Sequence, residues 1–246
     1  MASERQEIKT VSPWWGEHIH RYEEVSSHLS GSESILDIAC GTGFGTNLLA
    51  QKTKGNVFGG DIDQEAIKIS NDTWTQKNLT YEKMDATKLR FEDNSFDVVV
   101  SFETIEHTAE YNLMLTELLR VTKPNGTLFI STPNILINSP TGIVTNPYHT
   151  QEWTFEELKT ILTNIFPKVE IFGQKYARYN SNSFAKKVEN LMYKKGIRKI
   201  PIKFQDRVMN SLISKPMYPI TEDFELTVNS EEIKECKTFF CICKKQ

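Results

Sequence analysis

The sequence has few cysteines and no long hydrophobic run. Its 246 residues include only Cys40, Cys236, Cys241 and Cys243, and no two of these form a CxxC pair. This pattern argues against a structural zinc site and against a disulfide framework. No apolar run approaches the roughly 20 residues of a membrane-spanning helix, and the first residues, MASERQEIKT, are too polar for a signal peptide. We therefore expect a cytoplasmic protein that does not insert into a membrane.

A large excess of charge of one sign is missing as well. The formal net charge is -3, which argues against wholesale binding of nucleic acid. Residues 186–207 are a local exception, with eight basic side chains and two acidic ones. Such a stretch is either a solvated helical face or a docking surface for an anionic partner.

Short β-rich runs alternate with helical patterns from about residue 34. Strands are expected over residues 34–39, 56–61, 79–85, 96–101 and 126–132, and helices over 44–52, 64–77 and 109–121. The strand at 126–132 opens after the turn signal KPNG. This alternation predicts right-handed crossovers and a parallel sheet with helices on both faces. The expected fold class is α/β and Rossmann-like.

Two regions stand outside the alternation. Residues 13–30 look like an amphipathic helix before the first strand, and residues 173–235 interrupt the end of the domain. We expect one domain made of an N-terminal cap (1–33), a core (34–172), a helical insertion (173–235) and a last strand (236–246). Because the insertion is rich in aromatic and basic residues, we interpret it as a lid over the substrate.

The segment DIACGTGFG, residues 37–45, follows a strand and opens a helix. Asp61 ends the next strand, 20 residues after Gly41. Glycines let a ligand approach the backbone, and an acid at the tip of the second strand accepts hydrogen bonds from ribose hydroxyls. The pattern predicts a ribose-bearing cofactor at the carboxyl ends of the strands.

Two residues favour S-adenosylmethionine over a dinucleotide. The dinucleotide fingerprint GxGxxG needs a glycine where this chain has Thr46. Asp37 precedes the glycines, where its negative charge would repel a pyrophosphate. S-adenosylmethionine carries a sulfonium and an α-amino group instead, and a carboxylate attracts both.

Four segments resemble, in order, the motifs of class I S-adenosylmethionine-dependent methyltransferases of the type 11 and type 23 kind. They are ILDIACGTGFG, GGDID, MDATKLRFEDNSFDVVVSFETIEH and LRVTKPNGTLFISTPN. The resemblance implies a seven-stranded sheet whose last strand, TFFCICKK at 238–245, runs antiparallel, with a cap helix before the first strand.

The same resemblance implies the cofactor-binding residues. The methionine portion would be surrounded by Asp37, Gly41, Thr42 and Gly43, the ribose held by Asp61, and the adenine flanked by Ile62, Asp85 and Ala86. Glu103 would lie near the sulfonium. Trp15 and Tyr22 of the cap would close over the cofactor and exclude water.

Charged side chains also follow the fourth strand, in the stretch SFETIEH. If this stretch turns helically, Glu103, Glu106 and His107 share one face above the strand ends. A further imidazole, His149, is expected on the loop before a helix that Thr154 caps. Two carboxylates and two imidazoles could hold a divalent cation such as Mg2+ or Mn2+.

These four residues are similar to the ligands of metal-dependent 3′-terminal RNA ribose 2′-O-methyltransferases, in which two glutamates and two histidines chelate a cation. An ExxEH stretch also occurs in small-molecule methyltransferases that use no metal, where the same side chains form hydrogen bonds or contact the substrate. Without a metal, the chemistry needs a base that takes the acceptor's proton. His149 or His107 is the expected base because imidazole titrates near neutral pH, and Glu106 stands beside it.

The loop NPYHxxEW and the insertion resemble bacterial enzymes that methylate sugars, surface glycans or small metabolites. We therefore expect O-methylation of a small molecule, sugar or glycan, and the basic stretch favours an anionic acceptor. Three alternatives stay open. They are RNA ribose 2′-O-methylation, N-methylation of a small molecule, and a non-catalytic subunit that binds S-adenosylmethionine.

Overall fold

The computed structural model describes residues 15–177, 207, 211 and 218–246. These residues divide into two compact units. The first contains residues 21–175 and 226–246, and the second contains the described parts of 15–20 and 176–225. The basic stretch, apart from Arg207, and most of the expected lid lie outside the described residues, so their roles stay predictions.

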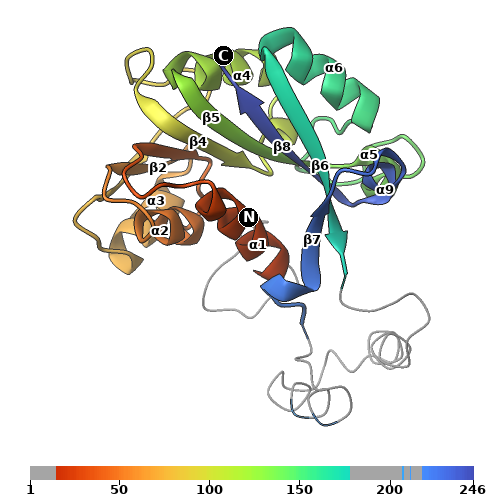
Figure 1. The fold of residues 1–246 in the computed structure, drawn as a ribbon, viewed down its shortest axis with the longest axis horizontal. Helices are drawn as coiled ribbons and strands as arrows, with labels where there is room; N and C mark the ends of the chain where they lie inside the picture. Colours follow the sequence, from red (N-terminus) through yellow and green to blue (C-terminus); the bar gives the residue numbers. More distant parts are fainter. Residues whose placement is uncertain (1–14, 178–206, 208–210, 212–217) are drawn as a thin grey trace. The chain divides into compact units, whose positions relative to one another are not determined.

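Within the described residues, a single sheet of eight strands organises the chain (Figure 1). The strands are β1 (Ile35–Ile38), β2 (Val57–Asp61), β3 (Leu79–Lys83), β4 (Phe96–Phe102), β5 (Thr122–Pro133), β6 (Lys168–Tyr176), β7 (Phe224–Thr227) and β8 (Thr238–Lys244). Their order is β3-β2-β1-β4-β5-β8-β6-β7. Strands β1 to β5 pair in parallel, whereas β8 is antiparallel to β5 and β6. The expected Rossmann-like sheet with an antiparallel last strand is confirmed.

The described sheet has one strand more than the seven expected. The additional strand, β7, lies in the segment that we interpreted as a helical insertion, and it neighbours β6 in the sheet order. Its four residues, FELT, are too few for hydrophobic periodicity to separate a strand from a loop. No strand was predicted from the sequence in this part of the expected helical insertion.

The described helices are α1 (Trp15–Ser27), α2 (Phe44–Ala50), α3 (Gln64–Thr73), α4 (Tyr111–Val121), α5 (Ile135–Asn138), α6 (Phe155–Ile165) and α9 (Ser230–Glu235). Two short 3-10 turns are η1 (Ile105–His107) and η3 (Thr221–Asp223). The predicted cap of α6 is confirmed, because Thr154 and Glu157 form a reciprocal capping box. Helix α3 ends before the expected residue 77, since Trp74 is extended and donates its Nε1–H to the carbonyl of Thr42.

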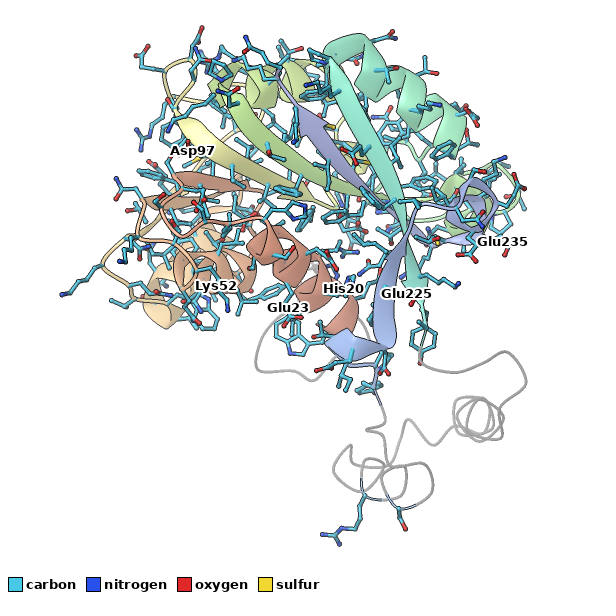
Figure 2. All side chains as sticks on the ribbon, in the orientation of Figure 1. His20, Glu23, Lys52, Asp97, Glu225 and Glu235 are labelled. Atoms are coloured by element: carbon cyan, nitrogen blue, oxygen red, sulfur yellow. The ribbon has the colours of Figure 1, made fainter. Side chains whose placement is uncertain are left out.

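Strand β5 begins earlier than expected. Thr122 already pairs with Phe96, and the register then shifts along β4. The KPNG segment at 123–126 is therefore an irregularity inside the strand rather than a turn before it. Lys123 helps to hold this segment in the sheet, because its Nζ donates to Oδ2 of Asp97 at 2.8 Å (Asp97 is labelled in Figure 2).

The two faces of the sheet pack against different helices (Figure 1). Leu128 and Ile130 of β5 belong to the main core, together with Leu118 of α4 and Leu162 of α6. Phe129 lies between them in sequence and points the other way, and its ring centroid is 5.3 Å from that of His28, directly after α1. Because helices cover both faces, polar residues with a chemical role are expected where the strands end.

The second unit is small in its described part. The Tyr176 and Phe224 ring centroids are 5.5 Å apart, and the backbone N–H of Ala177 donates to the carbonyl of Asp223. Gly16 has no room for a side chain, since an added Cβ would lie 2.5 Å from the carbonyl oxygen of Pro219. None of the helices in the described ranges is long and apolar enough to span a membrane.

Candidate active site

The turn after β1 needs glycine for two reasons. Gly41 and Gly43 have φ angles of 57° and 80°, in the left-handed region that favours glycine. A Cβ on Gly43 would also lie 2.7 Å from the ring of Tyr81 on β3. The Tyr81 hydroxyl donates to the carbonyl of Gly43 at 2.6 Å, so the ring holds the turn in place and excludes a side chain.

Replacing Gly43 with alanine is expected to destabilise the fold by about 2–4 kcal/mol, because the methyl group adds backbone strain and a clash with Tyr81. Gly142→Ala is the matched control, since Gly142 has a φ of 75° and open space around its Cβ position. Urea unfolding measures both variants. Equal losses would mean that the contact with Tyr81 does not exclude a side chain at Gly43.

Asp37 of β1 is almost completely buried, at 1% exposure. The Thr46 hydroxyl donates to its Oδ2 at 2.7 Å, and the Tyr22 hydroxyl lies 3.3 and 3.2 Å from its two oxygens. Burial raises the pKa of Asp37 to about 7. The carboxyl group can therefore ionise near neutral pH when a positive charge is brought to it.

Tyr22 and Thr46 both contact the Asp37 carboxyl group. Tyr22, expected at the cofactor, packs closely against α2, where a Cβ on Gly45 would lie 1.9 Å from its ring. Thr46 was not predicted as a site residue. The signal was present, however, because Thr46 stands where the dinucleotide fingerprint requires glycine.

The affinity for S-adenosylmethionine is expected to rise with pH. Asp37 is expected to face the positively charged methionine portion, and it attracts these charges only when ionised. Since the pKa of Asp37 is about 7, affinity should increase between about pH 6 and pH 8, by at most about tenfold per pH unit. Isothermal titration over this range tests the slope, and Asp37→Asn should bind more weakly and lose it. A slope that persists in Asp37→Asn would assign it to another group.

Asp61 ends β2 beside the glycine turn. Its Oδ2 accepts from the backbone N–H of Gly41 and its Oδ1 from that of Asp63, both at 2.9 Å. The following residue, Ile62, is 64% exposed and offers an apolar surface on which a flat ring could lie. This arrangement fits the predicted ribose and adenine contacts.

The other predicted adenine neighbours follow β3. Oδ1 of Asp85 accepts from the backbone N–H and the hydroxyl of Thr87 at 2.9 and 2.7 Å. Ala86 lies between these two residues and is half-buried. The predicted contacts of Asp85 and Ala86 with the adenine stay predictions, as does that of Trp15, which lies in the second unit.

Glu103 follows β4 with a φ of 48°, and its carboxylate turns toward β5. The Ser131 hydroxyl donates to its Oε1 at 2.7 Å. The fully buried Arg21 of α1 places Nη1 at 3.8 Å from the same oxygen and donates to Oε1 of Gln174 on β6. Glu103 is thus part of a charged group that joins α1 and the sheet.

Glu106 lies in η1 and is completely buried. The Thr132 hydroxyl donates to its Oε2 at 2.9 Å, whereas Oε1 has no hydrogen-bond partner within the part of the chain that the structure describes. Burial, and secondarily the charge of Glu103, raises the pKa of Glu106 well above its ordinary value. Burial therefore favours the protonated, neutral form of Glu106 compared with an exposed glutamate.

His107 presents one ring nitrogen with an available lone pair. Its Nδ1 lies 3.0 Å from the carbonyl oxygen of Tyr148, which can only accept, so Nδ1 carries the proton. The neutral ring then has its lone pair on Nε2, which is 3.9 Å from Oε1 of Glu106. An oxygen placed beside this pair of atoms, not on the line between them, would lie within hydrogen-bond distance of both.

His149 lies next to His107, and their ring centroids are 4.8 Å apart at an interplanar angle of 85°. Its Nδ1 is 2.7 Å from Oε1 of Glu152, and its Nε2 is 2.9 Å from Nδ2 of Asn146. Glu106, His107 and His149 each offer a ligand atom within 4.8 Å of the others.

The structure thus brings together three of the four residues expected to bind a metal. Glu103 is not in this group, because the 3-10 turn begins at Ile105 and Glu103 precedes it. The expected single helical face of Glu103, Glu106 and His107 does not form. Glu152 was missed as a site residue, although its spacing of three residues from His149 was a usable signal.

Residues 36–130 match the model of the methyltransferase domain family. The matched segment runs from β1 into β5 and includes the glycine turn, Asp61 and the ExxEH stretch. A probable S-adenosylmethionine-dependent methyltransferase of Mycolicibacterium smegmatis is 30% identical over 158 residues, which are 64% of this chain and 60% of that protein. A phthiotriol/phenolphthiotriol dimycocerosates methyltransferase of Mycobacterium ulcerans is 32% identical over 115 residues, 46% of this chain and 42% of that protein.

The match therefore spans less than two thirds of the length of these curated relatives. A chain from a solved complex of the Haloferax volcanii Trm112 methyltransferase activator and a methyltransferase has a TM-score of 0.60 at 16% identity. That likeness covers 94% of this chain and 92% of the other, and at such identity it shows the fold. The fold is that of the methyltransferases, and the relatives' names support S-adenosylmethionine as the cofactor. The resemblance to RNA 2′-O-methyltransferases is not confirmed.

Proposed function

We propose that this chain is an S-adenosylmethionine-dependent methyltransferase that modifies a hydroxyl group of a small molecule, sugar or glycan. One observation carries the choice of acceptor. The lone pair of His107 Nε2 lies 3.9 Å from Oε1 of Glu106, a carboxyl group whose neutral form is favoured by burial. A hydroxyl oxygen to one side of this pair, at about 2.8 Å from each atom, can donate to His107 and accept from the protonated form of Glu106.

When bound, S-adenosylmethionine supplies a methyl group that is already activated for attack by a nucleophile. The chain itself has to orient the acceptor and remove its proton. A hydroxyl needs this proton removal to become a good nucleophile, whereas a neutral amine attacks through its own lone pair. A base held beside the acceptor position therefore favours O-methylation over N-methylation.

The hydrogen bonds favour His107 over His149 as the base. The Nε2 lone pair of His149 accepts from Asn146 and its Nδ1–H is directed to Glu152, so both nitrogens have partners. In the described residues, no hydrogen bond uses Nε2 of His107. The Mycobacterium ulcerans relative supports a hydroxyl acceptor as well, because its name denotes a triol.

His107→Gln is expected to lower kcat by about 100-fold or more, the range typical of a lost general base, and to leave the Kd for S-adenosylmethionine nearly unchanged. His28→Gln is the matched control, since His28 is exposed beyond the end of α1. A screen of sugars, nucleotides and short RNA 3′ ends provides the acceptor. Full turnover by His107→Gln on the best acceptor would remove His107 from the mechanism.

We also expect methyl transfer to be insensitive to EDTA. The predicted metal tetrad would need Glu103 and Nε2 of His149. Glu103 already accepts from the Ser131 hydroxyl, and Nε2 of His149 accepts from the Asn146 amide. Activity assays with EDTA, followed by addition of Mg2+ or Mn2+, test this point. Loss of activity in EDTA that either cation restores would favour the metal-dependent alternative, in which Glu106, His107 and His149 bind the ion.

A further inference from the structure

Four hydrogen bonds connect Glu152 to His107 in a continuous chain. The Nδ1–H of His149 points to Oε1 of Glu152 at 2.7 Å, and Nδ2 of Asn146 lies 2.9 Å from Nε2 of His149. The backbone N–H of Tyr148 donates to Oδ1 of Asn146 at 3.0 Å, and the Tyr148 carbonyl accepts from Nδ1 of His107 at 3.0 Å. Every link ends on a group with a defined donor or acceptor role.

The direction of this chain is fixed at Asn146. The Tyr148 N–H is a donor, so the Asn146 atom that faces it must be the amide oxygen. The amide NH2 of Asn146 therefore faces His149 and donates to it, which requires a lone pair on Nε2 of His149. The proton of the neutral His149 ring then lies on Nδ1 and is directed to Glu152, whose side chain is 1% exposed.

The loop that carries this chain is also fastened to η1. The carbonyl of Glu106 accepts from the backbone N–H of Thr150 at 2.8 Å and from its hydroxyl at 3.0 Å. The Gln151 side-chain amide donates to the carbonyl of Thr108 at 2.7 Å. These bonds place the loop beside η1, but they do not orient the Tyr148 carbonyl. The Tyr148 carbonyl shares its peptide unit with the N–H of His149, which donates to the backbone carbonyl of Asn146 at 3.2 Å. The side-chain bonds of Asn146 hold the same turn at the Tyr148 N–H and at the His149 ring.

We propose that Glu152, His149 and Asn146 are positioning residues that hold the Tyr148 carbonyl against His107. They thereby fix the His107 tautomer in which Nδ1 carries the proton and Nε2 carries the lone pair. The use of that lone pair as a base rests on the proposed function. The tautomer itself does not, because it is a property of the chain without any acceptor. A histidine without such a partner exchanges its proton between the two nitrogens, and a wrongly placed proton would block it as a base.

Long-range 1H–15N correlation spectra of the full chain, labelled on histidine nitrogen, report the tautomer directly. The sequence has five histidines, so single substitutions assign the signals. In the wild-type chain we expect His107 and His149 to be protonated on Nδ1. Asn146→Ala should shift His107 toward an averaged, exchanging signal, because the turn that carries the Tyr148 carbonyl loses the bonds from the Asn146 side chain and keeps only the backbone bond from His149 to Asn146. Asn146 is partly exposed, so this variant should fold.

Two variants of Glu152 test whether its acceptor oxygen positions His149. Glu152→Gln keeps the size of the side chain and an acceptor oxygen, and Glu152→Ala removes both. Glu152→Ala removes the acceptor of the His149 proton and should shift the His107 signal toward the averaged, exchanging form. Glu152→Gln keeps an acceptor oxygen and should preserve the wild-type His107 signal. Glu156→Gln is the matched control, since Glu156 is exposed in the first turn of α6. Thermal melts establish whether each variant is folded. If Glu152→Ala does not fold, the His107 signal of Asn146→Ala alone tests the proposal.

The kinetic expectation is a fall in kcat of roughly 10- to 100-fold in Asn146→Ala, with KM for S-adenosylmethionine within about twofold of the wild type. Protonation of wild-type His107 on Nε2 would overturn the proposal. So would a His107 signal that Asn146→Ala and a folded Glu152→Ala leave unchanged. If no acceptor is ever methylated, the proposed function fails, whereas the tautomer measurement still confirms or overturns the positioning role.

Discussion

Two buried carboxyl groups at the ends of neighbouring strands determine how this site works. Asp37 lies in β1, one residue before its end, and Glu106 follows β4; burial is the main cause of the raised pKa of each. Each accepts one hydrogen bond from a threonine hydroxyl, from Thr46 and Thr132. Burial favours the neutral form of each carboxyl group, so each can ionise or donate according to the ligand beside it. The two acids thus suit different tasks. Asp37 can ionise and attract a cation, and Glu106 in its protonated form can donate a hydrogen bond to an oxygen.

The pleat of β5 explains why the two glutamates of ExxEH separate. Ser131 and Thr132 are consecutive residues of β5, and consecutive strand residues point to opposite faces of a sheet. Ser131 binds the carboxylate of Glu103, and Thr132 binds that of Glu106. The two carboxylates are therefore drawn apart, although helical spacing would have placed them together. One is paired with Arg21, and the other lies beside His107.

The sequence predicts those parts of the molecule that depend on local pattern. Alternating strands and helices, the glycine turn and the cap at Thr154 are each encoded within a few neighbouring residues, and the structure confirms them. It does not predict β7, whose four residues carry too little periodicity, or the pairing of Thr122 with Phe96. The protonation of His107 was equally out of reach, since its partner Tyr148 lies 41 residues away in the chain. Contacts of this kind arise only when separate strand ends meet.

The direction of the hydrogen bonds distinguishes two interpretations of the same cluster. Metal ligation through the histidines would need free lone pairs on both rings, whereas general-base chemistry needs one free lone pair and a fixed proton on the opposite nitrogen. His107 meets the second requirement, and His149 has its lone pair engaged by Asn146. Glu152 then takes the place that a carboxylate has behind a metal-bound histidine, but here it orients His149, and His149 supports the loop that orients His107. The hydrogen bonds of the cluster therefore match the proposed role of His107 as a base with supporting residues better than they match a metal site.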